Sequence, residues 1–163
     1  MKLFLRKNTD ATSDCCFTVY NESGSEIYRV VSSGKGFGER LLITSLNNEA
    51  LVSIRVLSMN FFYAFAVKDS EERFMMTMND IFSSHSYRFY GISWLFRSDT
   101  CGRSFEVCDY DNSVVMRQKA DKFITNGVYE LDVFSESREL FCIATAVCAD
   151  ILGFIDRTAV ASV

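Results

Sequence analysis

A chain of 163 residues can form one domain with a hydrophobic core, and 48% apolar residues exclude an intrinsically disordered protein. The formal net charge of −4 argues against a nucleic-acid-binding protein, because such proteins are normally basic. Proline is absent and phenylalanine occurs 15 times, which favours strands that no proline interrupts. We therefore expect a single domain over residues 1–163 that is mainly β.

The first ten residues, MKLFLRKNTD, do not resemble a secretory signal, because Arg6 and Lys7 directly follow a very short apolar stretch. The six cysteines include no C-x-x-C pair and no spacing typical of zinc ligands. We interpret them as reduced thiols of a cytoplasmic protein, which can be peripheral to a membrane.

The body of the chain repeats one pattern, in which an alternating apolar strand, a polar turn and a second strand follow each other. Three clear copies cover residues 17–30, 41–56 and 105–117. Further strand starts near residues 63, 87 and 129 extend the series to six units. Since each unit holds two strands, the repeat predicts about twelve antiparallel strands within residues 1–136.

Residues 140–155 read LFCIATAVCADILGFI and present no polar face, so the helix that they predict must be surrounded by lipid or protein. A spanning helix needs roughly 20 apolar residues, and this shorter run contains Asp150. We therefore predict a closed antiparallel barrel of about twelve strands around a central apolar helix over residues 137–155, with a short tail over 156–163. A tail-anchored membrane protein remains the alternative.

Asp150 is the formal charge inside this apolar run, and a buried carboxylate without a partner is too costly to persist. We expect it to meet an inward-facing Arg or Lys, or hydroxyl and backbone N–H donors, near one end of the barrel. Our preferred interpretation is a satisfied buried acid that fixes the register of the helix. The functional alternative is that Asp150 lines a small internal pocket.

Several segments resemble the LURP-one-related (tubby-like) family in sequence and in order along the chain. They are Gly38–Ile43, Trp94–Ser98 with Asp99 and Gly102, Phe105–Val107, Tyr129–Leu131 and Asp150–Leu152. The resemblance implies a twelve-stranded barrel around a central C-terminal helix, shared with tubby C-terminal domains and phospholipid scramblases. Tubby domains bind phosphoinositides through basic surface residues, but no motif here allows those positions to be transferred. The calcium-binding and palmitoylated segments of a scramblase are not evident.

Catalytic and metal-binding patterns are weak, so we expect no catalytic residue, no metal and no cofactor. His85 is the sole histidine, and neighbouring side chains of a strand point to opposite faces, so its serine neighbours do not form a catalytic couple with it. The glycines of residues 34–38 lack the GK[ST] ending of a phosphate loop. The acids of residues 69–72 and 109–111 fall where hairpins should turn, and packing is the expected role of Cys101 and Cys108.

Arg29, Arg55 and Arg117 each follow a strand residue of their unit by 12 positions, namely Phe17, Ile43 and Phe105. Equivalent positions in repeated hairpins should lie on one kind of face. If that face is outward, the arginines could bind phosphates or acidic lipid headgroups. Their ordinary role would be to pair with glutamates across strands and keep the sheet soluble.

These patterns favour a non-enzymatic binding or scaffold domain whose partner is an anionic membrane surface or another protein. Two alternatives remain open. The first is a small-ligand carrier or enzyme with a pocket at the barrel mouth. The second is a tail-anchored or scramblase-like membrane protein.

Overall fold

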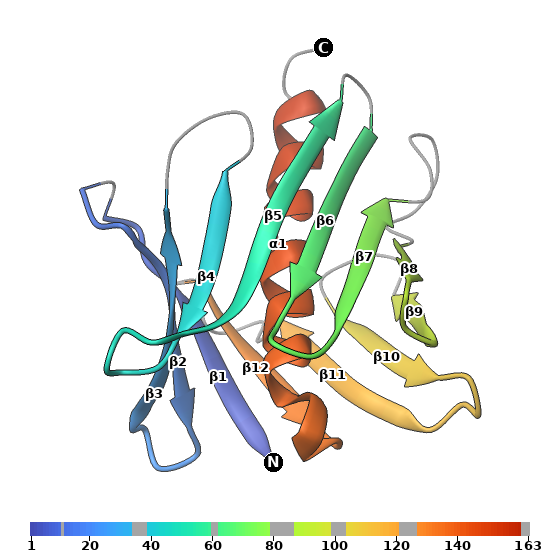
Figure 1. The fold of residues 1–163 in the computed structure, drawn as a ribbon, viewed down its shortest axis with the longest axis horizontal. Helices are drawn as coiled ribbons and strands as arrows, with labels where there is room; N and C mark the ends of the chain where they lie inside the picture. The colour runs from blue at the N-terminus through green and yellow to red at the C-terminus, as the bar shows by residue number, and fades with distance from the viewer. Residues whose placement is uncertain are drawn as a thin grey trace.

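The computed structural model describes residues 1–10, 12–33, 39–59, 62–78, 87–98, 104–120 and 127–160. Within these ranges twelve strands form one closed antiparallel barrel, which confirms the predicted fold class and strand number (Figure 1). The strands are β1 (Lys2–Lys7), β2 (Cys15–Asn21), β3 (Glu26–Ser32), β4 (Arg40–Thr44), β5 (Ala50–Met59), β6 (Phe62–Lys68), β7 (Arg73–Met78), β8 (Tyr87–Tyr90), β9 (Trp94–Ser98), β10 (Phe105–Asp109), β11 (Val114–Ala120) and β12 (Val128–Val133).

Each strand pairs with its neighbours in sequence, and the ring closes where β1 pairs with β12. The six strand starts expected from the repeat fall in the even-numbered strands β2 to β12. The sixth unit contributes only β12 before the chain turns helical. Its partner is the N-terminal strand, with Leu3 opposite Leu131. The barrel therefore joins the two ends of the strand region.

Side chains alternate between the interior and the outer face along each strand, as the pleat of a strand requires. On β5, for example, Val52 and Ile54 are buried whereas Arg55 is exposed. Tight turns join the two strands of the first five expected hairpins, and Asn48 and Asn112 take positive φ values of 63° and 66° in two of these turns. Asparagine tolerates this left-handed conformation better than most residues, which explains the polar turns of the repeat.

The C-terminal segment begins with a short 3-10 helix, η1 (Glu136–Arg138), and continues as α1 (Glu139–Val160). The helix thus runs beyond residue 155, where we expected a tail over 156–163. The apolar run ends near that point, but the loss of apolar residues does not by itself end a helix. Only a helix-breaking residue or a cap does so, and no proline is present.

The first half of α1 lies in the hydrophobic core. Residues 141–148 and Leu152 are buried, while Leu140 and residues 149–151 are half-buried, so burial over 140–152 is less complete than we expected. The helix contacts β5, β6 and β7, and also β11 in the opposite part of the ring. The ring of Phe141 meets that of Phe74 on β7 edge-on, with 5.1 Å between centroids. These contacts make the buried part of α1 belong to the same hydrophobic core as inward-facing side chains of the strands.

In the described part of the chain, no helix combines the length and the apolar character needed to cross a membrane.

Candidate anionic-surface site on the barrel wall

The three arginines singled out by the repeat all lie on strands and beside buried neighbours that face inward. Val30, Ile54 and Met116, next to them in sequence, are fully buried. Alternation therefore directs Arg29, Arg55 and Arg117 outward. They share this orientation, but the structure does not bring them together into one row.

Arg29 on β3 and Arg117 on β11 are separated by three strands, β2, β1 and β12. Each already has a carboxylate partner. Arg29 Nε lies 2.5 Å from Glu26 Oε1, and Arg117 Nε lies 2.6 Å from Glu106 Oε2. The hydrogen bond from Arg117 lowers the pKa of the Glu106 carboxyl. These two arginines thus have the cross-strand and local pairing that is ordinary for exposed strands.

Arg55 has a different environment, because it stands directly opposite another arginine, Arg40 on β4. Like charges at opposing positions destabilise a sheet. Two strands farther on, Lys68 of β6 stands opposite Arg73 of β7. The next strand, β8, adds Arg88 beside Thr77. This part of the wall therefore contains two like-charged cross-strand pairs and a fifth cation.

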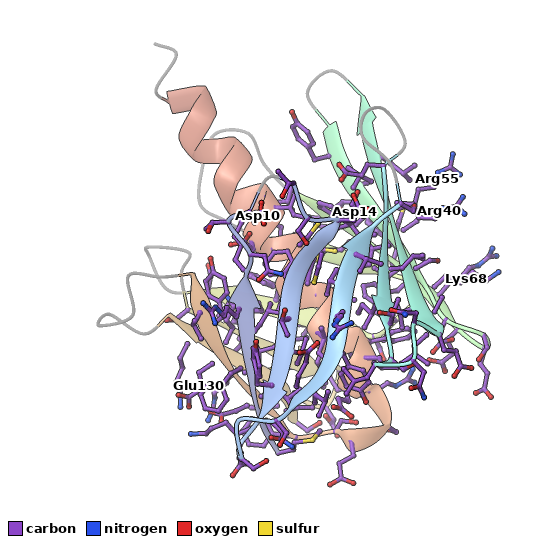
Figure 2. All side chains as sticks on the ribbon, turned by 90° about the vertical axis from the view of Figure 1, so that its left-hand side faces the viewer. Asp10, Asp14, Arg40, Arg55, Lys68 and Glu130 are labelled. Atoms are coloured by element: carbon purple, nitrogen blue, oxygen red, sulfur yellow. The ribbon has the colours of Figure 1, made fainter. Side chains whose placement is uncertain are left out.

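We call these five residues, Arg40, Arg55, Lys68, Arg73 and Arg88, the basic wall. Over the described residues, none of the five side chains makes an ion pair or a hydrogen bond. The sequences of the strands explain this, since β4 to β9 contain no Asp or Glu in any position. Figure 2 shows Arg40, Arg55 and Lys68 pointing away from the barrel on one side, with Glu130 on another part of the surface.

On β10–β12 and β1–β3, most cations are instead matched by acids, and Arg6 on β1 is the exception among the described residues. Besides the two arginine pairs above, Lys2 Nζ lies 2.7 Å from Glu130 Oε1, and Lys119 Nζ lies 2.9 Å from Asp132 Oδ2. The described barrel surface is therefore divided into a wall of mostly paired charges over β10–β12 and β1–β3 and a wall of unpaired cations over β4–β8.

Other acidic residues lie at the hairpin turns. Asp69 Oδ1 accepts hydrogen bonds from the backbone N–H groups of Glu71 and Glu72, each at 2.7 Å. Asp111 Oδ1 accepts one from the N–H of Ser113 at 2.9 Å. These carboxylates stabilise turns, and the described residues include no group of three His, Cys, Asp or Glu side chains that could hold a metal. His85, the glycines of 34–38 and Cys101 lie outside the described residues.

Asp150 lies on α1 near the barrel end where β1 stops and β12 starts. Its side chain is only 6% exposed. Lys7 Nζ donates to its Oδ2 at 2.6 Å, and the hydroxyl of Tyr129 donates to Oδ1. Lys7 and Arg6 also line a cavity of about 630 Å³ at this end of the barrel, together with residues of the segment after β1. The carboxylate thus has one charged and one neutral donor.

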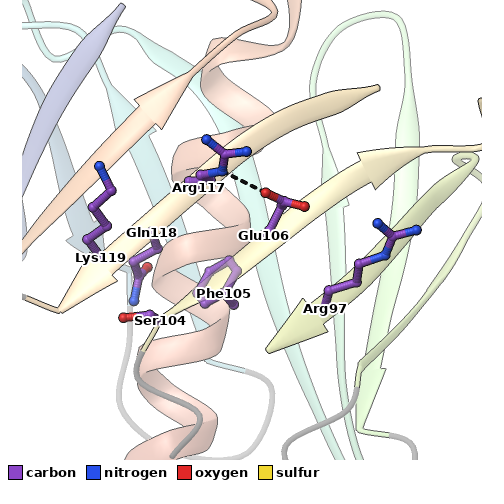
Figure 3. Close-up of a pocket in the computed structure, with 7 residues that line it drawn as sticks. All are labelled: Arg97, Ser104, Phe105, Glu106, Arg117, Gln118 and Lys119. Carbon is purple, nitrogen blue, oxygen red and sulfur yellow. Dashed lines mark hydrogen bonds and ion pairs between the residues drawn. The ribbon is translucent and has the colours of Figure 1, made fainter. Parts of the chain in front are cut away.

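A second hollow, of about 300 Å³, lies over β9–β11 (Figure 3). Its cations are engaged, because Arg117 binds Glu106 and Arg97 donates to Asn112 Oδ1 at 2.6 Å. Gln118 Oε1 is buried there without a hydrogen-bond partner. The two arginines of this hollow are therefore less available to a bound anion than the cations of the basic wall.

Sequence reasoning identified Arg55 but missed its neighbours Arg40, Lys68, Arg73 and Arg88. These residues do not recur at the 12-residue offset that singled out the three arginines. A usable signal was present in the sequence, since the strand segments from residue 40 to residue 98 contain basic residues and no acids.

Comparisons with known proteins agree with this architecture. A family profile described as LURP-one-related matches residues 1–150. The fold is also similar to the X-ray structure of a protein from Arabidopsis thaliana, with a TM-score of 0.66 and 11% sequence identity over 93% of this chain and 91% of that chain. At this identity the likeness concerns the fold alone. A search of curated proteins found no match.

Proposed function

The chain belongs to the LURP-one-related family, and on this basis we propose that it is a non-enzymatic binding domain that recognises an anionic surface. The partners that we propose are anionic lipid headgroups, phosphoinositides among them, at the cytoplasmic face of a membrane. In this proposal the basic wall binds the anionic headgroups. The helix α1 is a structural element enclosed by the barrel, and Asp150 is the buried acid that fixes the position of the helix.

The basic wall is the observation that carries the proposal. Five cations lie together without a partner in a protein whose formal net charge is −4. The arginine pair Arg40–Arg55 and the pair Lys68–Arg73 both oppose like charges, which costs stability. An anionic surface would remove this repulsion, and guanidinium groups form paired hydrogen bonds with phosphate oxygens. The wall is therefore better suited to a bound anion than to water.

The distribution of the acids supports an orientation in which the basic wall faces the anionic surface. The carboxylates of Asp69, Glu71, Asp111 and Glu136 lie at or next to the turns at one end of the barrel, and an anionic surface would repel them. Arg40, Arg55 and Arg88 lie away from these turns along the side of the barrel, whereas Lys68 and Arg73 flank the turn of residues 69–72. A domain with its basic wall on the surface would lie on its side, with the acidic turns directed along or away from that surface.

Vesicle cosedimentation tests the proposal. The protein is mixed with neutral phosphatidylcholine vesicles, or with vesicles that also contain phosphatidylserine, at about 0.1 M and about 1 M salt, where the Debye lengths are roughly 10 Å and 3 Å. We expect binding to the anionic vesicles at the lower salt concentration, and its loss at the higher one. Absence of binding to anionic vesicles at the lower salt concentration would contradict the proposal.

The cavity at the end of β1 favours a second candidate, a small-ligand carrier. Its volume of about 630 Å³ falls in the range of small-molecule sites, and Arg6 and Lys7 lie on its lining. Native mass spectrometry of the purified protein tests this candidate directly. A co-purified small molecule that is lost in a Lys7→Met variant would support it, and a mass equal to that of the chain alone would count against it.

A further inference from the structure

Three large apolar side chains are exposed on β7, β8 and β9, beside the basic wall. Met75 of β7 is 37% exposed, Tyr90 of β8 is 52% exposed and Leu95 of β9 is 49% exposed. Met75 stands directly opposite Tyr90, and Leu95 stands directly opposite Arg88. Since Arg88 and Tyr90 are two residues apart on β8, Leu95 is a diagonal neighbour of Tyr90. We call these three residues on adjacent strands the apolar strip.

The apolar strip and the basic wall are continuous. The register across five neighbouring strands places Tyr90, Met75, Ala66, Arg55 and Arg40 in one row, from β8 to β4. One end of this row is apolar, the small Ala66 lies in its middle, and the other end carries the opposing arginines. Arg88 lies next to the apolar end, so cations border the strip on both sides.

A single exposed apolar residue needs no explanation, but a contiguous group bordered by cations indicates an interaction site. Tyrosine has an apolar ring and a polar hydroxyl, which suits the headgroup region of a bilayer. Methionine is flexible and adapts to irregular apolar surroundings. Arginine can place its guanidinium at the phosphates while its methylene groups contact lipid chains. A soluble polyanion would bind the cations but leave the apolar strip in water.

We infer that the basic wall and the apolar strip together bind a lipid bilayer, with Met75, Tyr90 and Leu95 inserted below the phosphates of an anionic membrane. This inference rests on the proposed function and adds to it the class of partner and the depth of contact. Cations attract the domain to the headgroups, and the strip then removes apolar area from water.

Another exposed aromatic residue, Tyr110, does not share this environment. Tyr110 is 77% exposed, but it lies between Asp109 and Asp111 in the turn from β10 to β11. An anionic bilayer would repel that turn. Tyr110 therefore provides a matched control for Tyr90, since both are exposed tyrosines on the barrel surface.

Tryptophan fluorescence tests the insertion. The variants Tyr90→Trp and Tyr110→Trp are titrated with phosphatidylcholine and phosphatidylserine vesicles whose acyl chains are brominated, and each is compared with the wild type, whose Trp94 is buried. We expect a blue shift and quenching beyond the wild-type signal for Tyr90→Trp only. Vesicle binding without this quenching would overturn the insertion and leave the proposed function standing. Absence of vesicle binding would overturn both.

The variant Leu95→Ser provides a second test that does not depend on fluorescence. We expect it to weaken vesicle binding by about fivefold to tenfold, because less apolar area leaves water. Its binding to inorganic polyphosphate, a soluble polyanion, should equal that of the wild type. Equal weakening toward both ligands, or wild-type binding to vesicles, would contradict insertion of the apolar strip.

Discussion

Lys7 and Asp150 lie 143 residues apart in sequence, yet the ammonium of one lies 2.6 Å from the carboxylate of the other. This pair joins the first strand to the C-terminal helix. Tyr129 of β12 donates to the same carboxylate, so the two strands that close the barrel both bind the helix. One acidic side chain thus connects the closure of the ring to the position of its core helix.

A double-mutant cycle measures this connection. We expect the variants Asp150→Asn and Lys7→Met to show a coupling free energy of about 1.5–3 kcal/mol in urea unfolding, because the carboxylate is 6% exposed and its hydrogen bonds are charge-assisted. The same cycle on the surface pair Lys2–Glu130 should give about 0–1 kcal/mol. Equal coupling in both cycles would show that Asp150 behaves as a surface acid.

The core role of α1 predicts a strong dependence of stability on its buried side chains. Ile143 is fully buried, so Ile143→Ala should reduce the free energy of unfolding by about 2–5 kcal/mol. Leu46 lies exposed in the turn between β4 and β5, and Leu46→Ala should change stability by less than about 0.5 kcal/mol. Chemical denaturation of both variants checks the difference, and a small effect at Ile143 would contradict its burial against the strands.

Thiol reactivity should follow burial. Burial raises the pKa of the Cys142 thiol to about 12 and also raises that of Cys148. Among the five cysteines in the described ranges, iodoacetamide should therefore modify Cys15 and Cys16 first and spare the two helix thiols until the protein unfolds. Peptide mass spectrometry identifies the modified sites. Rapid modification of Cys142 in the folded protein would contradict the enclosed core.

The same shift predicts the direction of a pH effect. An unfolded Cys142 ionises near its ordinary pKa of 9.0, whereas the folded thiol stays protonated up to about 12. The unfolded state therefore gains from losing a proton between these values, and stability should fall as pH rises from 9 to 12. A Cys142→Ala variant should lose less stability than the wild type over this range in urea unfolding. A parallel pH dependence of both proteins would contradict the prediction.

The ladder between β8 and β9 is the shortest in the described barrel, with Arg88 and Leu95 as its paired position. In contrast, β5 and β6 remain paired from Ser53–Lys68 to Met59–Phe62. We expect backbone amides of β8 and β9 to exchange with solvent faster than those of β5 and β6, as hydrogen-exchange mass spectrometry would show. Equal protection would show that the aromatic contacts, such as Phe89 with Trp94, compensate for the short ladder.

The fold class could be predicted because the repeat and the apolar helix are both local patterns. Alternation located the even-numbered strands, but it could not show that β1 completes the last unit, since that pairing joins opposite ends of the chain. The partner of Asp150 could not be predicted for the same reason, because it comes from the opposite end of the chain. Burial required a partner, but only the closed ring brings Lys7 to the helix.

The binding surface was harder to predict, because equivalence between repeats fixes the face of a strand and not its place around the ring. Arg29 and Arg117 share an outward face with Arg55, yet they lie on other strands and beside acids. The cross-strand register determines which cations lie beside Arg55, and it places Arg40 directly opposite. Register depends on bulges and turn lengths that a strand pattern does not reveal.

A comparison of two double variants tests the central claim, that the unpaired cations of the basic wall bind an anionic surface. The wall variant combines Arg40→Gln with Arg55→Gln, and the control variant combines Arg29→Gln with Arg117→Gln. Both remove two positive charges, the first from the basic wall and the second from ion pairs. Affinity for phosphatidylserine vesicles is measured for both, after urea unfolding shows that both fold. We expect the wall variant to lose about 2 kcal/mol, or roughly 30-fold, and the other less than about threefold. Equal losses, or a greater loss in the second variant, would contradict the account.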